Sequence, residues 1–115
     1  MSESIGKALE RCLRVNFVDF AGSGGAVRVE TVAQDDWASV TFSGARHRVR
    51  ITLDGQGATG AAADFLAVMS DVELPTPGHI VADLSLRADA RSDSGDHAWL
   101  ELDILTVEDE DASRS

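Results

Sequence analysis

The sequence contains a single cysteine, Cys12, only one lysine, and no long run of apolar residues. One cysteine allows no internal disulfide and no metal site built from several cysteines. No apolar stretch approaches the roughly 20 residues that a transmembrane helix requires. The first residues, MSESIGKALER, also lack the basic-then-apolar order of a secretory signal. We therefore expect a cytoplasmic protein, where an unpaired cysteine stays reduced.

Basic residues are scarce: the chain has 10 against 20 acidic ones, a formal net charge of −10. Nucleic-acid binding and docking on anionic membranes both depend on Lys and Arg, so we expect neither. An acidic surface favours solubility and is compatible with a basic partner. The basic residues are almost all Arg, a usage typical of a GC-rich genome, which we expect to be bacterial.

The length of 115 residues, with 43% hydrophobic and 26% charged residues, is typical of one globular domain. We expect a single α+β domain over residues 1–108. The acidic tail, residues 109–115, is expected to be disordered.

Residues 3–12 place four apolar side chains at helical spacing, and Ser2 or Ser4 is positioned to cap this short helix. The four are Ile5, Ala8, Leu9 and Cys12. Residues 13–20 are richer in β-branched and aromatic residues, and their apolar and polar residues alternate, which favours a strand. The alternative is that the helix continues to about residue 16.

Three runs with β character follow, residues 26–33, 37–43 and 46–54. Two-residue turns at 34–35 and at 44–45 would join them into an antiparallel meander. Both turns place the same apolar set on one face, which a shift in register would turn outward. The set is Val27, Val29, Val40, Phe42, Val49, Ile51 and Leu53.

A helix is expected over residues 59–72, capped by Thr59 and ended by the prolines that follow. Its apolar stripe consists of Ala62, Phe65, Leu66, Met69 and Val72.

The last third of the chain predicts a long hairpin with its turn at residues 92–96. Pairing Ala90 with Ala98 brings Leu86 opposite Leu102 and Leu84 opposite Ile104. The same register sets Arg87 opposite Glu101, a favourable charge pair.

These elements predict an α+β fold: an antiparallel β-sheet, built from a meander of three or four strands plus a C-terminal hairpin, packed by one helix, with a short N-terminal helix. The element order is similar to that of small acidic dimeric secretion chaperones, although their usual C-terminal helix is missing here. The resemblance implies a dimer that acts on a protein partner.

Arg46, Arg48 and Arg50 alternate along one strand, on the face opposite the valines. An arginine row of this kind can bind an acidic peptide, a phosphate or a carboxylate. The alternative is a solvated sheet face, balanced by nearby acidic residues.

Several apolar residues share the parity of the polar residues: Trp99, Leu105, Val107 and Val81 on the hairpin, and Trp37 and Val32 on the meander. Such residues often mark a protein–protein surface. The alternative is that the N-terminal helix covers them. The candidate binding residues are therefore Arg46, Arg48, Arg50, Trp37, Trp99 and Leu105.

No motif for a catalytic nucleophile or a metal site is present, so we expect no catalytic residue, no metal and no cofactor. The first hypothesis is a non-enzymatic interaction domain, a homodimer that binds another protein through a sheet face. The alternative is a small-ligand-binding protein or enzyme with a pocket between helix 59–72 and the sheet. That pocket would place His47, His79 or His97 beside an acidic residue.

Overall fold

The computed structural model describes residues 3–108, so the predicted tail at 109–115 lies outside the described residues. The elements, in chain order, are helices α1 (Ile5–Val15) and α2 (Val18–Gly22), strands β1 (Ala26–Ala38) and β2 (Ser43–Asp54), helix α3 (Ala58–Val68), the 3₁₀ turn η1 (Met69–Asp71), and strands β3 (His79–Arg91) and β4 (His97–Glu108). No helix among the described residues is long and apolar enough to cross a membrane.

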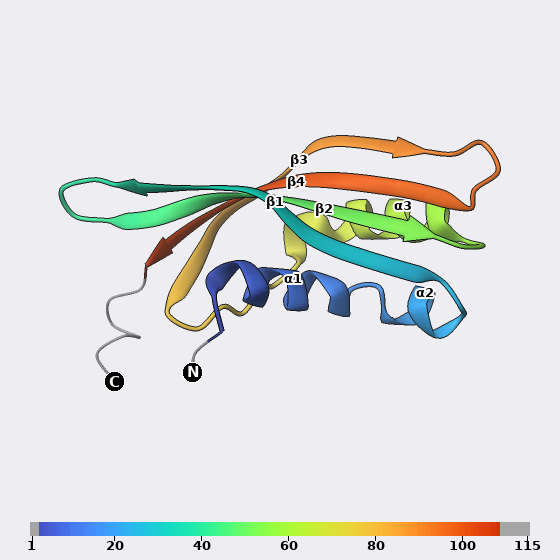
Figure 1. Ribbon diagram of the computed structural model, residues 1–115, viewed down its shortest axis with the longest axis horizontal. Coiled ribbons are helices and arrows are strands. Elements are labelled where there is room, and N and C mark those ends of the chain that lie inside the picture. The colour runs from blue at the N-terminus through green and yellow to red at the C-terminus, as the bar shows by residue number, and fades with distance from the viewer. Residues whose placement is uncertain (1–2, 109–115) are drawn as a thin grey trace.

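The four strands form one antiparallel sheet in the order β1-β2-β4-β3, with β2 and β4 in the centre. Figure 1 shows α1 and α3 on the same side of this sheet. The sheet twists strongly, so the β1–β2 hairpin extends away from the helices at one end. The longest dimension of the molecule is 49 Å. The predicted α+β class, with a helix packed on the sheet and a short N-terminal helix, is confirmed.

The N-terminal segment is helical beyond residue 12, so the expected strand over 13–20 is wrong and the longer helix is correct. Ser4 caps α1, because its Oγ accepts a hydrogen bond from the Lys7 amide at 3.2 Å. Leu13 and Phe17 are buried while Val15 is exposed, which is the spacing of a helix and not of a strand. Because the segment is helical, Leu13 and Phe17 extend the buried apolar stripe of α1 along the sheet.

The expected meander is two long strands rather than three short ones. Both expected turns, at 34–35 and 44–45, lie inside strands, and the chain reverses at residues 39–42 instead. Val40 and Phe42, expected in the core, are therefore exposed at the hairpin end. The single hairpin still places the other residues of the expected apolar set on the inner face of the sheet. It pairs Val27 with Leu53 and Val29 with Ile51.

The C-terminal hairpin has the predicted pairs Leu84–Ile104 and Leu86–Leu102. Beyond these pairs a bulge at Arg87 shifts the register by one residue, so Ala90 lies opposite Trp99 and not Ala98.

The core lies between the helices and the inner face of the sheet. Helix α3 starts after Gly57, not at a Thr59 cap, and it continues as a 3₁₀ turn through Asp71. Its Phe65 ring packs against Phe17, with the ring centroids 5.2 Å apart. The sheet contributes the fully buried residues Val49, Ile51, Leu53, Ala98, Leu100 and Leu102.

Candidate functional site: the open face of the sheet

The opposite face of the sheet is not covered by α1 or α3, and we call it the open face (Figure 1). Cross-strand pairing places Trp37 opposite Gly44, Arg46 opposite Leu105, and Thr52 opposite Trp99. Side chains at even positions of β2 share this face because successive strand residues point to opposite sides. The structure therefore brings all six predicted binding residues to one face: Arg46, Arg48, Arg50, Trp37, Trp99 and Leu105.

Val81 does not join them, although the sequence pattern predicts that it does. A bulge at Ala82 reverses the parity of the strand, so Val81 pairs with the buried Thr106 and packs against the core. Val107 does lie on the open face, in the row that contains Gly44.

An ion-pair network centred on Glu101 occupies the middle of the open face. The Glu101 carboxylate lies 3.0 Å from Arg50, 3.5 Å from Arg87 and 3.6 Å from Arg48. Its side chain is only 13% exposed. Asp103 adds contacts of 3.5 Å to Arg87 and 3.8 Å to Arg48. Two of the three arginines in the row are thus neutralised within the protein.

The network is continuous with an aromatic side chain. The Arg50 guanidinium lies over the Trp99 ring, 4.6 Å from its centroid, which is cation–π geometry. The sequence indicates the pair of Arg87 with Glu101, but not the role of Glu101 as the centre of three arginines. That role depends on β2 and β3 both flanking β4, an order that only the folded sheet defines.

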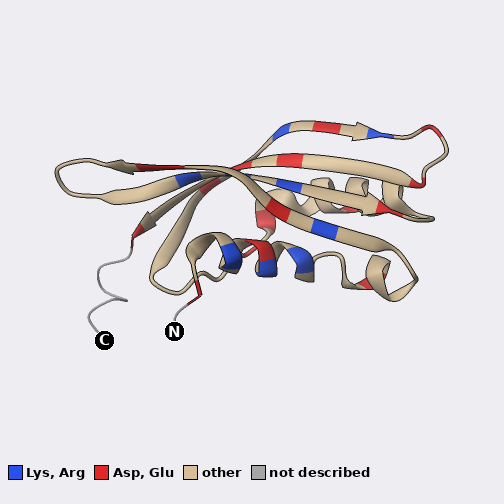
Figure 2. Ribbon diagram, in the orientation of Figure 1, with Lys and Arg blue, Asp and Glu red and all other residues tan. Residues whose placement is uncertain are grey.

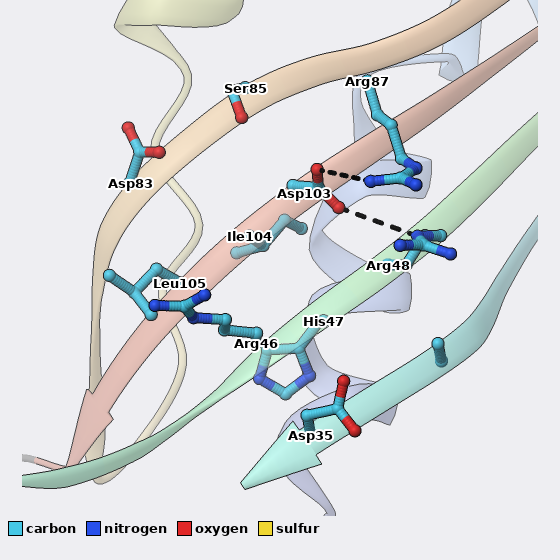
Figure 3. A pocket seen from close by; sticks show the side chains of 11 residues that line it. Asp35, Arg46, His47, Arg48, Asp83, Ser85, Arg87, Asp103, Ile104 and Leu105 are labelled. Carbon is cyan, nitrogen blue, oxygen red and sulfur yellow. Dashed lines mark hydrogen bonds and ion pairs between the residues drawn. The ribbon is translucent and has the colours of Figure 1, made fainter. Parts of the chain in front are cut away.

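Beside this network the open face contains a hollow of about 460 Å³. Its charged lining is balanced, with three arginines and three aspartates (Figure 3): Asp35, Arg46, Arg48, Asp83, Arg87 and Asp103. Arg46 differs from the other two arginines, because it makes no ion pair within residues 3–108. It lies beside Leu105, its cross-strand partner (Figure 3). Figure 2 shows acidic and basic positions interspersed along the strands.

His47 is on the other face, 1% exposed. Its Nε2 lies 2.9 Å from Thr106 Oγ1, and that hydroxyl donates to the Ala45 carbonyl at 3.3 Å. This arrangement makes Nε2 the donor and leaves Nδ1 buried without a partner. Burial is the main cause that lowers the pKa of His47, and the nearby His79 lowers it further while Asp36 acts in the opposite direction.

In two hollows that border α3 and the 3₁₀ turn, no histidine of the described residues makes an ion pair with a carboxylate. One hollow lies between α2 and α3, over Phe17 and Phe65, and contains no histidine. A second lies between residues 69–76 and β3 and includes His79, but His79 has no carboxylate partner within residues 3–108. His97 does pair with a carboxylate, Asp54, at an exposed position outside both hollows.

Metal-ligating residues are dispersed. Within residues 3–108, no group of three or more His, Cys, Asp or Glu side chains is placed to hold a metal ion. Cys12 is buried, and its thiol donates to the Pro75 carbonyl at 3.2 Å, which ties α1 to the segment before β3.

No protein-family model and no curated protein matches the chain. A functional proposal therefore rests on the geometry of the open face.

Proposed function

We propose that this protein is a non-enzymatic interaction domain that acts as a homodimer and binds another protein through the open face. The observation that carries this proposal is that large apolar side chains lie at both ends of the arginine row, on a face that neither helix covers: Trp37 and Leu105 beside Arg46, and Trp99 beside Arg50. Aromatic residues and Arg are the types enriched at the energetic centres of protein interfaces.

The Glu101 network gives this face a fixed shape. Arg50 donates a hydrogen bond to Glu101, and Arg48 and Arg87 lie within ion-pair distance of the same carboxylate, which restricts these side chains before a partner arrives. Ordered side chains reduce the entropy that association costs. The partner therefore binds a surface on which the Arg50 guanidinium is already stacked on the Trp99 ring.

Arg46 supplies the specificity in this proposal. It is the member of the row without an ion pair in the described part of the chain, and it borders the hollow next to Leu105. A guanidinium binds a carboxylate through two parallel hydrogen bonds. The partner segment we expect carries an apolar side chain for Leu105 and Trp37 and an adjacent carboxylate for Arg46.

The test compares partner capture by the wild-type protein with capture by open-face variants. Tagged wild-type protein, Trp99→Asp and Arg46→Glu are incubated with a lysate of the native host, and captured proteins are quantified. The control is Val18→Asp, an exposed apolar position on α2. The affinity of each captured protein is then measured with purified components.

The proposal expects a partner whose affinity falls at least about tenfold, or about 1.4 kcal/mol, with either open-face variant and is unchanged with the control. If every captured protein binds the open-face variants as tightly as the wild type, the proposal is wrong.

A further inference from the structure

The two edges of the sheet differ in what blocks them. At the β1 edge, the Glu10 carboxylate of α1 accepts a hydrogen bond from the Thr31 amide at 3.1 Å. At the β3 edge, no strand of the described chain pairs with residues 79–91 from outside (Figure 1). An unpaired strand edge presents amide and carbonyl groups that another strand can bind.

The apolar side chains of β3 are also incompletely covered. Helix α3 packs over β4 and β2, so the inner face of β3 lies beyond it. On this inner face Leu86 is 37% exposed, whereas its cross-strand partner Leu102 is buried. A groove of about 650 Å³ with mixed polar and apolar lining runs along the first half of β3, with Met69 and Val72 on its other side.

We propose that β3 pairs with β3 of a second copy of this chain, antiparallel, about a two-fold axis at Ser85. This register places Leu84 opposite Leu86 of the partner subunit, both on the inner face. It also places Asp83 opposite Arg87 of the partner subunit, both on the open face. The two-fold axis repeats each contact, so the strand is complementary to itself in charge and in apolar surface.

Charge favours an axis at Ser85 over an axis at either neighbouring charged residue of the open face. Moving the axis to Asp83 or to Arg87 would place that residue against its own copy, and like charges directly opposite one another destabilise strand pairing. Asp83 makes no ion pair within residues 3–108, so its carboxylate is available for this contact.

The proposed pairing uses the regular stretch of β3 that follows the bulge at Ala82, together with Arg87, the residue at which the next bulge lies. Bulges and charged residues on an edge strand discourage open-ended association. A two-fold pairing is closed, because each β3 has one free edge and that edge is used once. The pairing would join two sheets into one and set the two open faces side by side.

This inference rests on the homodimer of the proposed function and locates its contact. The main test is a charge swap, measured by analytical ultracentrifugation over a concentration series. In a homodimer of Asp83→Arg, or of Arg87→Asp, residues 83 and 87 would carry the same charge at both contacts. Each variant alone should therefore be monomeric. Mixed in equal amounts, the two variants restore opposite charges at both contacts and should form a heterodimer.

A second test does not disturb the Glu101 network. In a Cys12→Ala background, Ser85→Cys places two thiols at the proposed axis, and a short bis-maleimide should yield a covalent dimer in high proportion. Thr41→Cys, at the exposed end of the β1–β2 hairpin, is the control and should remain monomeric on the same gel.

The outcomes separate the two proposals. A wild-type dimer that persists in both charge variants, or equal cross-linking at positions 85 and 41, overturns the β3 contact and leaves the homodimer standing. A wild-type protein that is monomeric throughout the concentration series overturns both the contact and the homodimer. Binding of a partner through Trp99 and Arg46 is judged separately, by the affinity measurements above.

Discussion

The Glu10 carboxylate on α1 binds both polar groups of Thr31 on β1. One carboxylate oxygen accepts from the Thr31 hydroxyl at 2.9 Å and from its amide at 3.1 Å, next to the bulge of the edge strand. The Glu10 side chain is only 15% exposed. This contact positions the helix and satisfies an edge amide that β2 does not.

Removing this carboxylate should destabilise the fold. Glu10→Ala leaves the Thr31 amide and hydroxyl without their acceptor, and we expect a loss of about 1–3 kcal/mol in the free energy of unfolding, measured by urea denaturation. Lys7→Ala is the control: it removes only the exposed ion pair to Glu10 and should change stability by less than about 0.5 kcal/mol. Equal effects of the two substitutions would contradict this assignment.

Glu101→Gln should destabilise the sheet through repulsion among Arg48, Arg50 and Arg87. These arginines are partly exposed, so we expect a loss of about 1–3 kcal/mol rather than the larger cost of a fully buried pair. Added salt should recover part of the loss, because it screens the remaining like charges. Asp103→Asn, at a more exposed carboxylate, is the control and should cost less; a larger loss there would refute the central role of Glu101.

Stability should decline as the pH falls below about 6.5, the ordinary pKa of histidine. Burial lowers the pKa of His47 in the folded state, so between 6.5 and that lower value the unfolded chain binds the proton more readily. The stabilisation that comes from the neutral, buried His47 is fully present above pH 6.5 and is lost as the pH falls toward the lowered pKa of the folded state.

His47→Gln keeps a donor for Thr106 but does not titrate, so urea denaturation across this pH range should show a flatter profile. A wild-type slope retained in His47→Gln would assign the effect to other groups.

Two glycine substitutions should act in opposite directions. A Cβ at Gly44 would collide with the Thr106 carbonyl of the neighbouring strand, so Gly44→Ala should cost about 1–3 kcal/mol or more. A Cβ at Gly60, inside α3, would meet nothing within 4 Å, and Gly60→Ala should stabilise by about 0.5–1 kcal/mol. Thermal denaturation of both variants decides this; a tolerated Gly44→Ala would mean that β4 can shift.

Helix α1 and the β3–β4 hairpin could be predicted from the sequence, because their patterns depend only on the spacing of nearby apolar residues. Ile5, Leu9 and Cys12 recur at helical spacing, and Leu84 and Leu86 alternate with polar residues, so each predicted face is the buried one or faces the core. The boundary at residue 13 was ambiguous, since Leu13 and Phe17 fit both periods. Packing against the sheet selects the helical one.

The turns of the first hairpin depend on more than local chemistry. Gly44 and Ala45 suit a turn, but they lie in β2 because a single hairpin pairs more of β1 and keeps Val29 and Val49 in the core. Glycine is required at 44 by the close approach of Thr106, a residue 62 positions away along the chain, and no local pattern records that contact.

Along β2 the sequence by itself determined which residues share a face, because side-chain parity follows from the geometry of a regular strand: Arg46, Arg48 and Arg50 lie on one face and Val49 on the other. The tertiary structure decided which charges are neutralised on that face and which strands form the edges of the sheet. Glu101 reaches three arginines only because β4 lies between β2 and β3, and Glu10 reaches Thr31 only because α1 lies beside β1. Strand order and helix placement are set by long-range packing, which residue spacing does not encode.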